Sequence, residues 1–216
     1  MNLTQDWLKK CRIKINETKS VHATFTLRKG RCPPVTINNV EIPIAAVTKY
    51  LSMHLDHKLS WRDHVVMKRK QIELKVKELY WLLGRKSQLS TENKLLIYKT
   101  IIKPIWTYSI EIWGCASKSN QAILQKAQSK ILHMITNAPR YVYNLTLHED
   151  LKIPYVREVI FEKYAKHHRK LETHPNPLPS PFTGHWAAKT TEEDPARGPA
   201  MRQSRFRHWT RSHHVT

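Results

Sequence analysis

Lys19 is the residue near the start of the chain that is best placed to do chemistry. It follows Asn16 at the end of a predicted strand, and a lysine held beside phosphates can neutralise them or donate a proton. A two-metal phosphoryl-transfer site would also need paired carboxylates. Before residue 60 the acidic residues are isolated from one another in the sequence: Asp6, Glu17, Glu41 and Asp56. The sequence therefore predicts no metal site here, and Lys19 by itself is one lysine among many.

Other patterns of catalytic or metal-binding residues are weak. His148-Glu149-Asp150 is the densest polar cluster, but a metal site needs at least three ligands at defined spacing. The sequence holds no H-E-x-x-H, no C-x-x-C and no glycine-rich nucleotide loop. We therefore interpret the histidines as surface residues. The three cysteines are odd in number and far apart, which favours a reducing compartment inside the cell, either cytoplasm or nucleus: Cys11, Cys32 and Cys115.

The charge of the chain is the first functional clue. Its 216 residues carry a formal net charge of +20, and 40% of them are hydrophobic, which is enough for a folded core. Residues 61–172 alone hold 21 Lys and Arg against ten Asp and Glu, so the excess is not confined to one end. Such a charge suggests a polyanionic partner, most often nucleic acid and less often a membrane surface or an acidic protein. No apolar run is long enough for an ordinary membrane-spanning helix.

The first 56 residues are expected to be rich in strands. Asn38-Asn39 is typical of a two-residue hairpin turn, because Asn tolerates the positive φ that such turns require. Strand-like stretches are expected at residues 13–16, 21–27, 35–37, 40–42 and, as one further strand, 47–55. A few short strands leave one face uncovered, so this segment cannot be a complete domain.

Helical periodicity begins at Arg62 and continues to about residue 172. One stripe of the first helix is expected to be buried: Val65, Ile72, Val76, Leu79 and Leu83. Lys68 and Lys75 border one edge of that stripe and Arg69 borders the other. Lys70 and Lys77 lie on the opposite, solvent-exposed face.

Further helices are predicted from caps and breakers. Ser90 caps a helix that runs to a kink or break at Pro104, and the segment continues to Gly114. Ser119 caps the next helix, which ends before Asn137, and two more follow near residues 145–151 and 156–171. We expect three aromatic residues to pack in the core: Trp106, Tyr108 and Trp113. The proline-rich residues 173–216 are expected to be mostly disordered.

Two sets of motifs carry a resemblance to a known family. The first resembles the end of the reverse transcriptase palm of jockey-like non-LTR (LINE-type) retrotransposons: Lys14-Ile-Asn-Glu-Thr-Lys-Ser20, Cys32-Pro-Pro-Val35 and Val47-Thr-Lys-Tyr-Leu-Ser-Met-His-Leu-Asp56. The second resembles the thumb that follows: Trp61-x-x-His64, Tyr80-Trp-Leu-Leu-Gly-Arg-Lys-Ser-Gln-Leu-Ser90, Lys94-Leu-Leu-Ile-Tyr-Lys99 and Ile112-Trp-Gly114. With later anchors, the similarity extends from about residue 7 to residue 178.

The resemblance implies an α+β fold in three parts. Residues 1–56 would be a β-rich palm remnant, residues 57–172 a helical thumb and connection, and residues 173–216 the disordered tail. It further implies that Lys19 assists pyrophosphate release as a general acid. A primer-grip-like hairpin would hold the growing 3′ end: Lys49, Tyr50 and Leu51. The thumb helix would track the backbone of RNA template and DNA primer through Lys68, Arg69 and Lys75.

The sequence departs from the family pattern at several positions. Ser52 and Ser109 stand where the family usually has Gly, and Asn39 replaces the usual Gly of the first hairpin. The metal-binding Phe-Ala-Asp-Asp segment is not in this sequence, so the resemblance implies Mg²⁺ only for the full-length polymerase and no cofactor for this chain. The expected function is that of a polymerase fragment, inactive alone, that binds template–primer backbone, and whether it is an enzyme stays open. The alternatives are a domesticated nucleic-acid-binding or protein-interaction module and a non-functional transposon relic.

Overall fold

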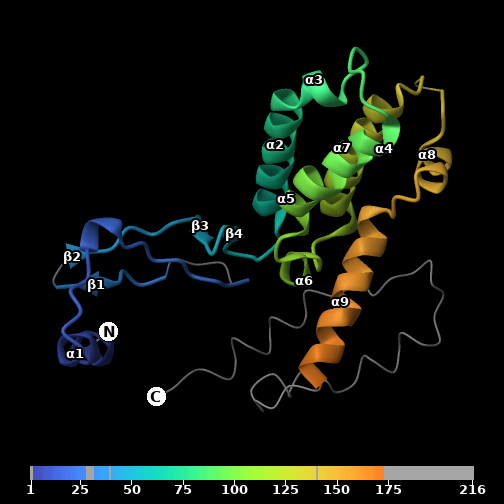
Figure 1. Ribbon diagram of the computed structural model, residues 1–216. Coiled ribbons are helices and arrows are strands. Elements are labelled where there is room, and N and C mark those ends of the chain that lie inside the picture. Colours follow the sequence, from blue (N-terminus) through green and yellow to red (C-terminus); the bar gives the residue numbers. More distant parts are fainter. Residues whose placement is uncertain (1, 28–31, 39, 140, 173–216) are drawn as a thin grey trace. The chain divides into compact units, whose positions relative to one another are not determined.

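The computed structural model describes residues 2–27, 32–38, 40–139 and 141–172, and the side chains of all of these except 2–5 and 172. The fold is α+β, as the resemblance implies. Contacts divide the chain into two units (Figure 1), one ending at His64 and the other beginning at Val65. We call them the strand unit and the helical unit. The predicted disorder of residues 173–216 concerns a segment outside the described residues.

The strand unit contains two small antiparallel sheets. Its elements are α1 (Asn2–Lys10), the 3₁₀-helix η1 (Glu17–Lys19), β1 (Thr36–Ile37), β2 (Val40–Glu41), β3 (Val47–Tyr50) and β4 (Met53–Asp56). β1 pairs with β2, and β3 pairs with β4. The strands expected at residues 13–16 and 21–27 do not form, apart from an isolated bridge between His22 and Ile44. Alternation alone is insufficient, because a strand needs a neighbour that accepts its backbone hydrogen bonds.

The two hairpins differ in how well the sequence predicted them. The turn at Asn38 is confirmed, with φ of 50° and Ile37 opposite Val40, while Asn39 lies outside the described residues. The single strand expected over residues 47–55 is wrong, because the chain reverses at Leu51 and Ser52. Both have positive φ, 45° and 62°, as the central residues of a type I′ turn require.

The strand unit buries little apolar surface. Among its described hydrophobic residues, the buried ones are Ile42, Met53 and Trp61. Its exposed large hydrophobic residues are more numerous: Trp7, Ile13, Val21, Phe25, Leu27, Val40, Ile44, Val47, Tyr50 and Leu51. This distribution follows from the fold, since two two-stranded sheets leave most of their faces uncovered.

The helical unit is formed by packed helices. In order they are α2 (Arg62–Glu78, its first turn within the strand unit), α3 (Tyr80–Leu83), α4 (Thr91–Ile97), the π-helix η2 (Tyr98–Ile102), α5 (Lys103–Thr107), α6 (Ile110–Trp113), α7 (Lys118–Thr136), α8 (Asn144–Asp150) and α9 (Val156–Glu172). α7 contacts α4, α8 and α9, and α9 also contacts α6 (Figure 1). No helix in the described part of the chain has the length and apolar character needed to cross a bilayer.

The caps of this unit largely follow the prediction. Ser90 caps α4, its Oγ accepting the N–H of Asn93 at 3.3 Å. The cap expected at Ser119 is wrong, because Ser117 Oγ accepts the N–H of Asn120 at 3.3 Å and α7 begins two residues earlier. Two serines a residue apart both satisfy the capping pattern, and only the observed backbone distinguishes them. α7 ends at Thr136, and Asn137, which follows it, is in the left-handed conformation.

The helix expected between Pro104 and Gly114 is interrupted. Pro104 lies directly after the π-helix, in helical backbone that is continuous from Thr91 to Thr107. The π-helix interrupts the regular i→i−4 hydrogen bonds, so the missing N–H of Pro104 is accommodated there. Tyr108 is extended and Ser109 is left-handed, with φ of 52°, so the segment forms two short helices. Trp106 and Trp113 are buried as predicted, but Tyr108 is 46% exposed, because this break turns it away from the core.

Candidate nucleic-acid interface

The buried stripe predicted for α2 and α3 is largely confirmed. Val65, Ile72, Val76 and Leu83 are buried, whereas Leu79 is half-buried. These residues anchor α2 against the helical unit and thereby set which of its basic side chains reach solvent. The cations near this stripe are the candidate phosphate contacts.

Lys68 is buried rather than placed at the border of the stripe. Its residue exposure is 7%, and its ammonium lies 5.3 Å from the centroid of the Tyr108 ring. A cation over an aromatic face is stabilised by the ring quadrupole. Lys68 lies three residues after Val65 and four before Ile72, on the buried face of the helix. Its charge contributes to the local potential, but its ammonium is engaged within the protein.

Arg69 and Lys75 are accessible, and each forms a local ion pair. Arg69 Nε lies 2.9 Å from Glu73 Oε1, and Lys75 Nζ lies 2.5 Å from Glu78 Oε2. Their side chains remain 52% and 40% exposed. Exposed ion pairs of this kind contribute about 0–1 kcal/mol, so a phosphate could displace the carboxylate at little cost.

The outer face of α2 carries further exposed groups. Lys70, Leu74 and Lys77 follow one another at helical spacing, and all three are exposed. In the described structure neither lysine belongs to an ion pair. Trp81 lies on α3, the short helix that follows, and it is 72% exposed. Sequence reasoning missed Trp81 as a candidate binding residue.

The primer-grip-like residues lie together on one hairpin of the strand unit. Lys49 and Tyr50 end β3 and Leu51 begins the turn, with Tyr50 opposite Met53. Tyr50 is 59% and Leu51 is 64% exposed, and Lys49 is exposed as well. The β3–β4 hairpin therefore presents these three side chains to solvent.

Hydrogen bonds at the end of this hairpin connect it to the start of α2. The Asp56 carboxylate accepts the backbone N–H groups of Ser60 and Trp61 at 3.0 and 3.1 Å. Burial raises the pKa of Asp56, but these hydrogen bonds and one from the Ser60 hydroxyl hold it below its ordinary value overall. His64 Nδ1 accepts the N–H of His54 at 3.2 Å, and Trp61 contacts the His64 ring edge-on. The Trp61-x-x-His64 motif thus holds the hairpin in place.

Lys19 ends the short helix η1, and its side chain is exposed. Asn16 caps this turn, with its Oδ1 accepting the N–H of Lys19 at 3.2 Å. The Glu17 carboxylate accepts a hydrogen bond from the Asn38 amide, which lowers the pKa of Glu17. This bond ties η1 to the β1–β2 hairpin and occupies the carboxylate nearest to Lys19 in the sequence.

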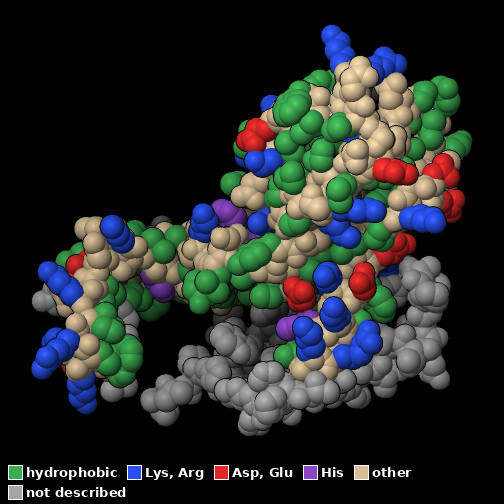
Figure 2. All heavy atoms as spheres, viewed as in Figure 1, with side chains coloured by type: hydrophobic (Ala, Val, Ile, Leu, Met, Phe, Trp, Pro, Cys, Tyr) green, Lys and Arg blue, Asp and Glu red, His purple; other side chains and the backbone are tan. Residues whose placement is uncertain are grey.

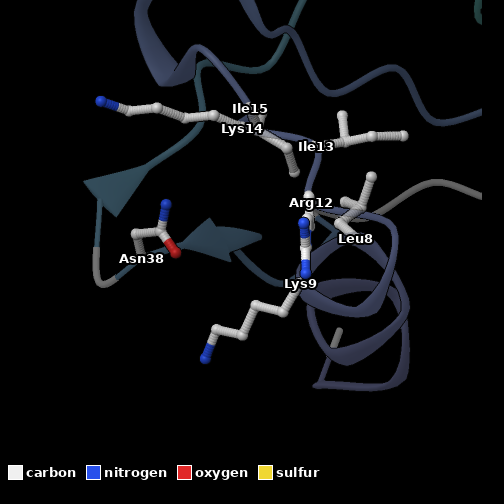
Figure 3. A pocket seen from close by; sticks show the side chains of 7 residues that line it. All are labelled: Leu8, Lys9, Arg12, Ile13, Lys14, Ile15 and Asn38. Atoms are coloured by element: carbon white, nitrogen blue, oxygen red, sulfur yellow. The ribbon is translucent and has the colours of Figure 1, made fainter.

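A basic pocket lies beside the same elements (Figure 3). Its volume is about 310 Å³, and its lining residues are Leu8, Lys9, Arg12, Ile13, Lys14, Ile15 and Asn38. Aliphatic side chains line part of it, and the three cations come from the end of α1 and the segment that follows. No carboxylate lines this pocket, so it presents positive charge only.

The described residues do not fit a two-metal site. They contain no group of three His, Cys, Asp or Glu side chains that could hold a metal ion. Near Lys19, Glu17 is engaged by Asn38, and Asp56 is engaged by the start of α2. No step that needs Mg²⁺ can therefore be assigned to the described residues.

Within the polar cluster at residues 148–150, His148 has a structural role, and the expectation that it lies on the surface is wrong. His148 is 4% exposed and stacks on Tyr155 with ring centroids 3.9 Å apart. Gln125 Oε1 accepts the N–H of Val156, so its amide nitrogen faces His148 Nε2 at 3.1 Å. His148 Nδ1 then donates to the carbonyl of Ile153 at 2.7 Å. The His148 ring links α7, α8 and the segment before α9.

The sequence of this chain is similar to those of several polymerases from transposons. It is 40% identical over 175 residues to a probable RNA-directed DNA polymerase from transposon X-element of Drosophila melanogaster, which is 81% of this chain and 19% of that protein. It is 34% identical over 174 residues to the RNA-directed DNA polymerase from mobile element jockey of Drosophila funebris, again 81% and 19%. A probable RNA-directed DNA polymerase from transposon BS of Drosophila melanogaster is 32% identical over 170 residues, 78% of this chain and 19% of that protein.

These similarities confirm the resemblance to RNA-directed DNA polymerases of jockey-like transposons. The chain spans about a fifth of the length of these curated relatives. No family model matches the chain. No solved structure matches it either.

Proposed function

We propose that this chain is the part of an RNA-directed DNA polymerase that binds the template–primer backbone and does not transfer nucleotides by itself. The observation that carries the proposal is the 32–40% identity to three transposon polymerases over about four-fifths of the chain. The formal net charge of +20 supports a polyanionic partner. None of the three cysteines forms a disulfide within the described part of the chain, which supports a location inside the cell, in cytoplasm or nucleus.

In this proposal the helical unit acts as a thumb, and α2 lies along the phosphates of an RNA–DNA hybrid. Arg69 and Lys75 contact phosphates by exchanging their local carboxylate partners for the nucleic acid. Lys68 contributes to the positive potential from the buried face of α2. It does not contact phosphates directly, because its ammonium is held against Tyr108. Such contacts neutralise phosphates without reading sequence, so binding is tolerant of sequence and sensitive to salt.

The strand unit would serve the growing end of the primer. Lys49, Tyr50 and Leu51 would form the grip, since the β3–β4 hairpin exposes them together. Lys19 would act as a general acid only when a longer polymerase supplies the metal-binding carboxylates. The chain alone therefore binds nucleic acid and has no polymerase activity, and Mg²⁺ belongs to the longer enzyme.

A salt titration with matched variants tests this function. The full chain should bind a blunt RNA–DNA hybrid at low salt, and R69Q/K75Q should reduce the slope of log affinity against log salt by up to about 2. The control K126Q/K130Q removes two exposed lysines from α7. If both variants reduced the slope of log affinity against log salt equally, binding would arise from the overall charge of the chain, and α2 would be rejected as the phosphate-binding surface. Template-dependent primer extension by the purified chain would reject the inactive-alone assignment.

A further inference from the structure

An exposed tryptophan lies on α3, the short helix that follows α2. α3 contains only Tyr80–Leu83, and it is anchored by Leu83, which is fully buried. Tyr80 is 58% exposed and Trp81 is 72% exposed, so two aromatic side chains face solvent on one short helix. A large, exposed indole beside charged groups is typical of a binding surface rather than of a fold element.

The corner that carries these rings is internally braced. The N–H of Gly84 donates to the carbonyl of Tyr80 at 2.7 Å. A Cβ at Gly84 would lie 2.6 Å from that carbonyl and 3.2 Å from the Tyr80 ring, so only glycine permits this close turn. Lys94, which is 7% exposed, donates from Nζ to the carbonyl of Gly84 at 3.2 Å. The corner is thereby tied to α4, and Trp81 is displayed on an ordered support.

Several exposed cations lie close to Trp81 in the sequence. Lys77 precedes Trp81 by four residues, across the break at Leu79 between α2 and α3, and Arg85 and Lys86 follow α3. All three are exposed, and none of them forms an ion pair with a residue that the structure describes. The nearest carboxylate in the sequence, Glu78, is paired with Lys75. Figure 2 shows hydrophobic side chains over α2 and α3 and Lys or Arg side chains at the tip of the α3–α4 connection.

We propose that this corner binds unpaired nucleotides of single-stranded nucleic acid, with a base stacked on Trp81 and phosphates held by Lys77, Arg85 and Lys86. The inference rests on the proposed function, since the single strand would be the overhang beside the hybrid. Aromatic faces accept any base, and flanking cations follow the backbone, so the site does not select sequence. A protein partner with an apolar surface would instead have to bury three cations without carboxylates.

The test compares three ligands by fluorescence anisotropy with the full chain: a blunt RNA–DNA hybrid, the same hybrid with a short RNA overhang, and the overhang RNA alone. Wild type should bind the overhang hybrid at least about fivefold more tightly than the blunt hybrid, as expected for one stacked base. W81A should lose this gain and keep its affinity for the blunt hybrid, while W81F should retain part of it. The control Y141A removes an aromatic side chain that is 81% exposed elsewhere, and it should keep the gain.

Several outcomes would overturn the inference. One is that wild type binds the overhang hybrid no more tightly than the blunt hybrid. Another is that W81A still binds the overhang hybrid more tightly. The third is that W81A loses as much affinity for the blunt hybrid as for the overhang hybrid. If W81A keeps the overhang gain but loses binding to a poly-glutamate peptide, the corner is a protein-docking surface and the inference fails. If the blunt hybrid does not bind but the overhang RNA binds through Trp81, the inference stands and the hybrid-binding function is rejected.

Discussion

The two units of this chain achieve order by different means. The helical unit buries whole aromatic side chains and fixes its connections with a polar network around His148. The strand unit depends on turns, on the carboxylate of Asp56 and on a small apolar cluster, while most of its large hydrophobic residues face solvent. Burial of apolar surface is the dominant stabilising contribution to folding, so most of the stability of the isolated chain should reside in the helices.

Because the helical unit is better packed than the strand unit, the candidate binding residues of α2 and α3 are more preorganised than those of the β3–β4 hairpin. The basic and aromatic groups of α2 and α3 are displayed by a packed helical unit, so their spacing is set before any ligand arrives. The hairpin that carries Lys49, Tyr50 and Leu51 lacks comparable support within its own unit. A preorganised surface binds with a smaller ordering cost, so α2 and α3 should dominate nucleic-acid binding by the isolated chain.

The largest expected effect comes from removing a buried tryptophan of the helical unit. Trp113 is fully buried, and its Nε1 donates to the carbonyl of Tyr108 at 3.0 Å. W113A should lower the free energy of unfolding by about 3–5 kcal/mol in urea titrations followed by circular dichroism. The matched change W7A in the strand unit, where Trp7 is 58% exposed, should alter it by less than about 0.5 kcal/mol. Similar losses in both variants would remove the contrast between the units.

A smaller effect, confined to the strand unit, should appear in acid. The pKa of Asp56 is lowered in the folded state, so its contribution to stability is present above the unfolded-state pKa and is lost as pH falls through the folded-state pKa. Amides of the β3–β4 hairpin should lose protection in acid before those of α7 do. D56A should cost the hairpin about 1–3 kcal/mol, because the N–H groups of Ser60 and Trp61 lose their acceptor. D56N should abolish the pH dependence, and an unchanged acid response in that variant would exclude Asp56 as its source.

The smallest expected effect is a gain in stability from replacing one serine by glycine in each unit. Ser52 and Ser109 have φ of 62° and 52°, a region that is unfavourable for residues with a Cβ, and both stand where the family usually has Gly. S52G and S109G should each stabilise their own unit by about 0.5–1 kcal/mol, as judged from local amide exchange for the hairpin and thermal melting for the helices. Alanine at the same positions keeps the Cβ and serves as the control. Equal gains from alanine and glycine would show that backbone strain is not the cause.

The sequence predicted those features that depend on local chemistry. The buried stripe of α2, the Ser90 cap, the hairpin at Asn38 and the end of α7 before Asn137 all follow from periodicity or side-chain preference. The errors lie where tertiary contacts decide. Lys68 is buried because Tyr108 offers its ring, and no periodic pattern shows that partner.

A second error has the same origin, and a third arises from an atypical turn. His148 is buried because Gln125 and the carbonyl of Ile153 satisfy both ring nitrogens, from positions 23 and five residues away. The alternation of apolar residues over 47–55 concealed a two-residue turn, because Leu51 and Ser52 lack the Asn or Gly that usually marks one. Contacts between residues far apart in the sequence, and turns made by atypical residues, could therefore not be predicted from this sequence alone.

The most direct test of this account is backbone amide hydrogen exchange across the full free chain. We expect slow exchange in α7 and α9, because these two helices pack against one another. We expect much faster exchange throughout β1–β4, where two small sheets have little covering them. Equally slow exchange in both units would contradict this account, because the strand unit would then hold a stabilising partner that its contacts do not contain.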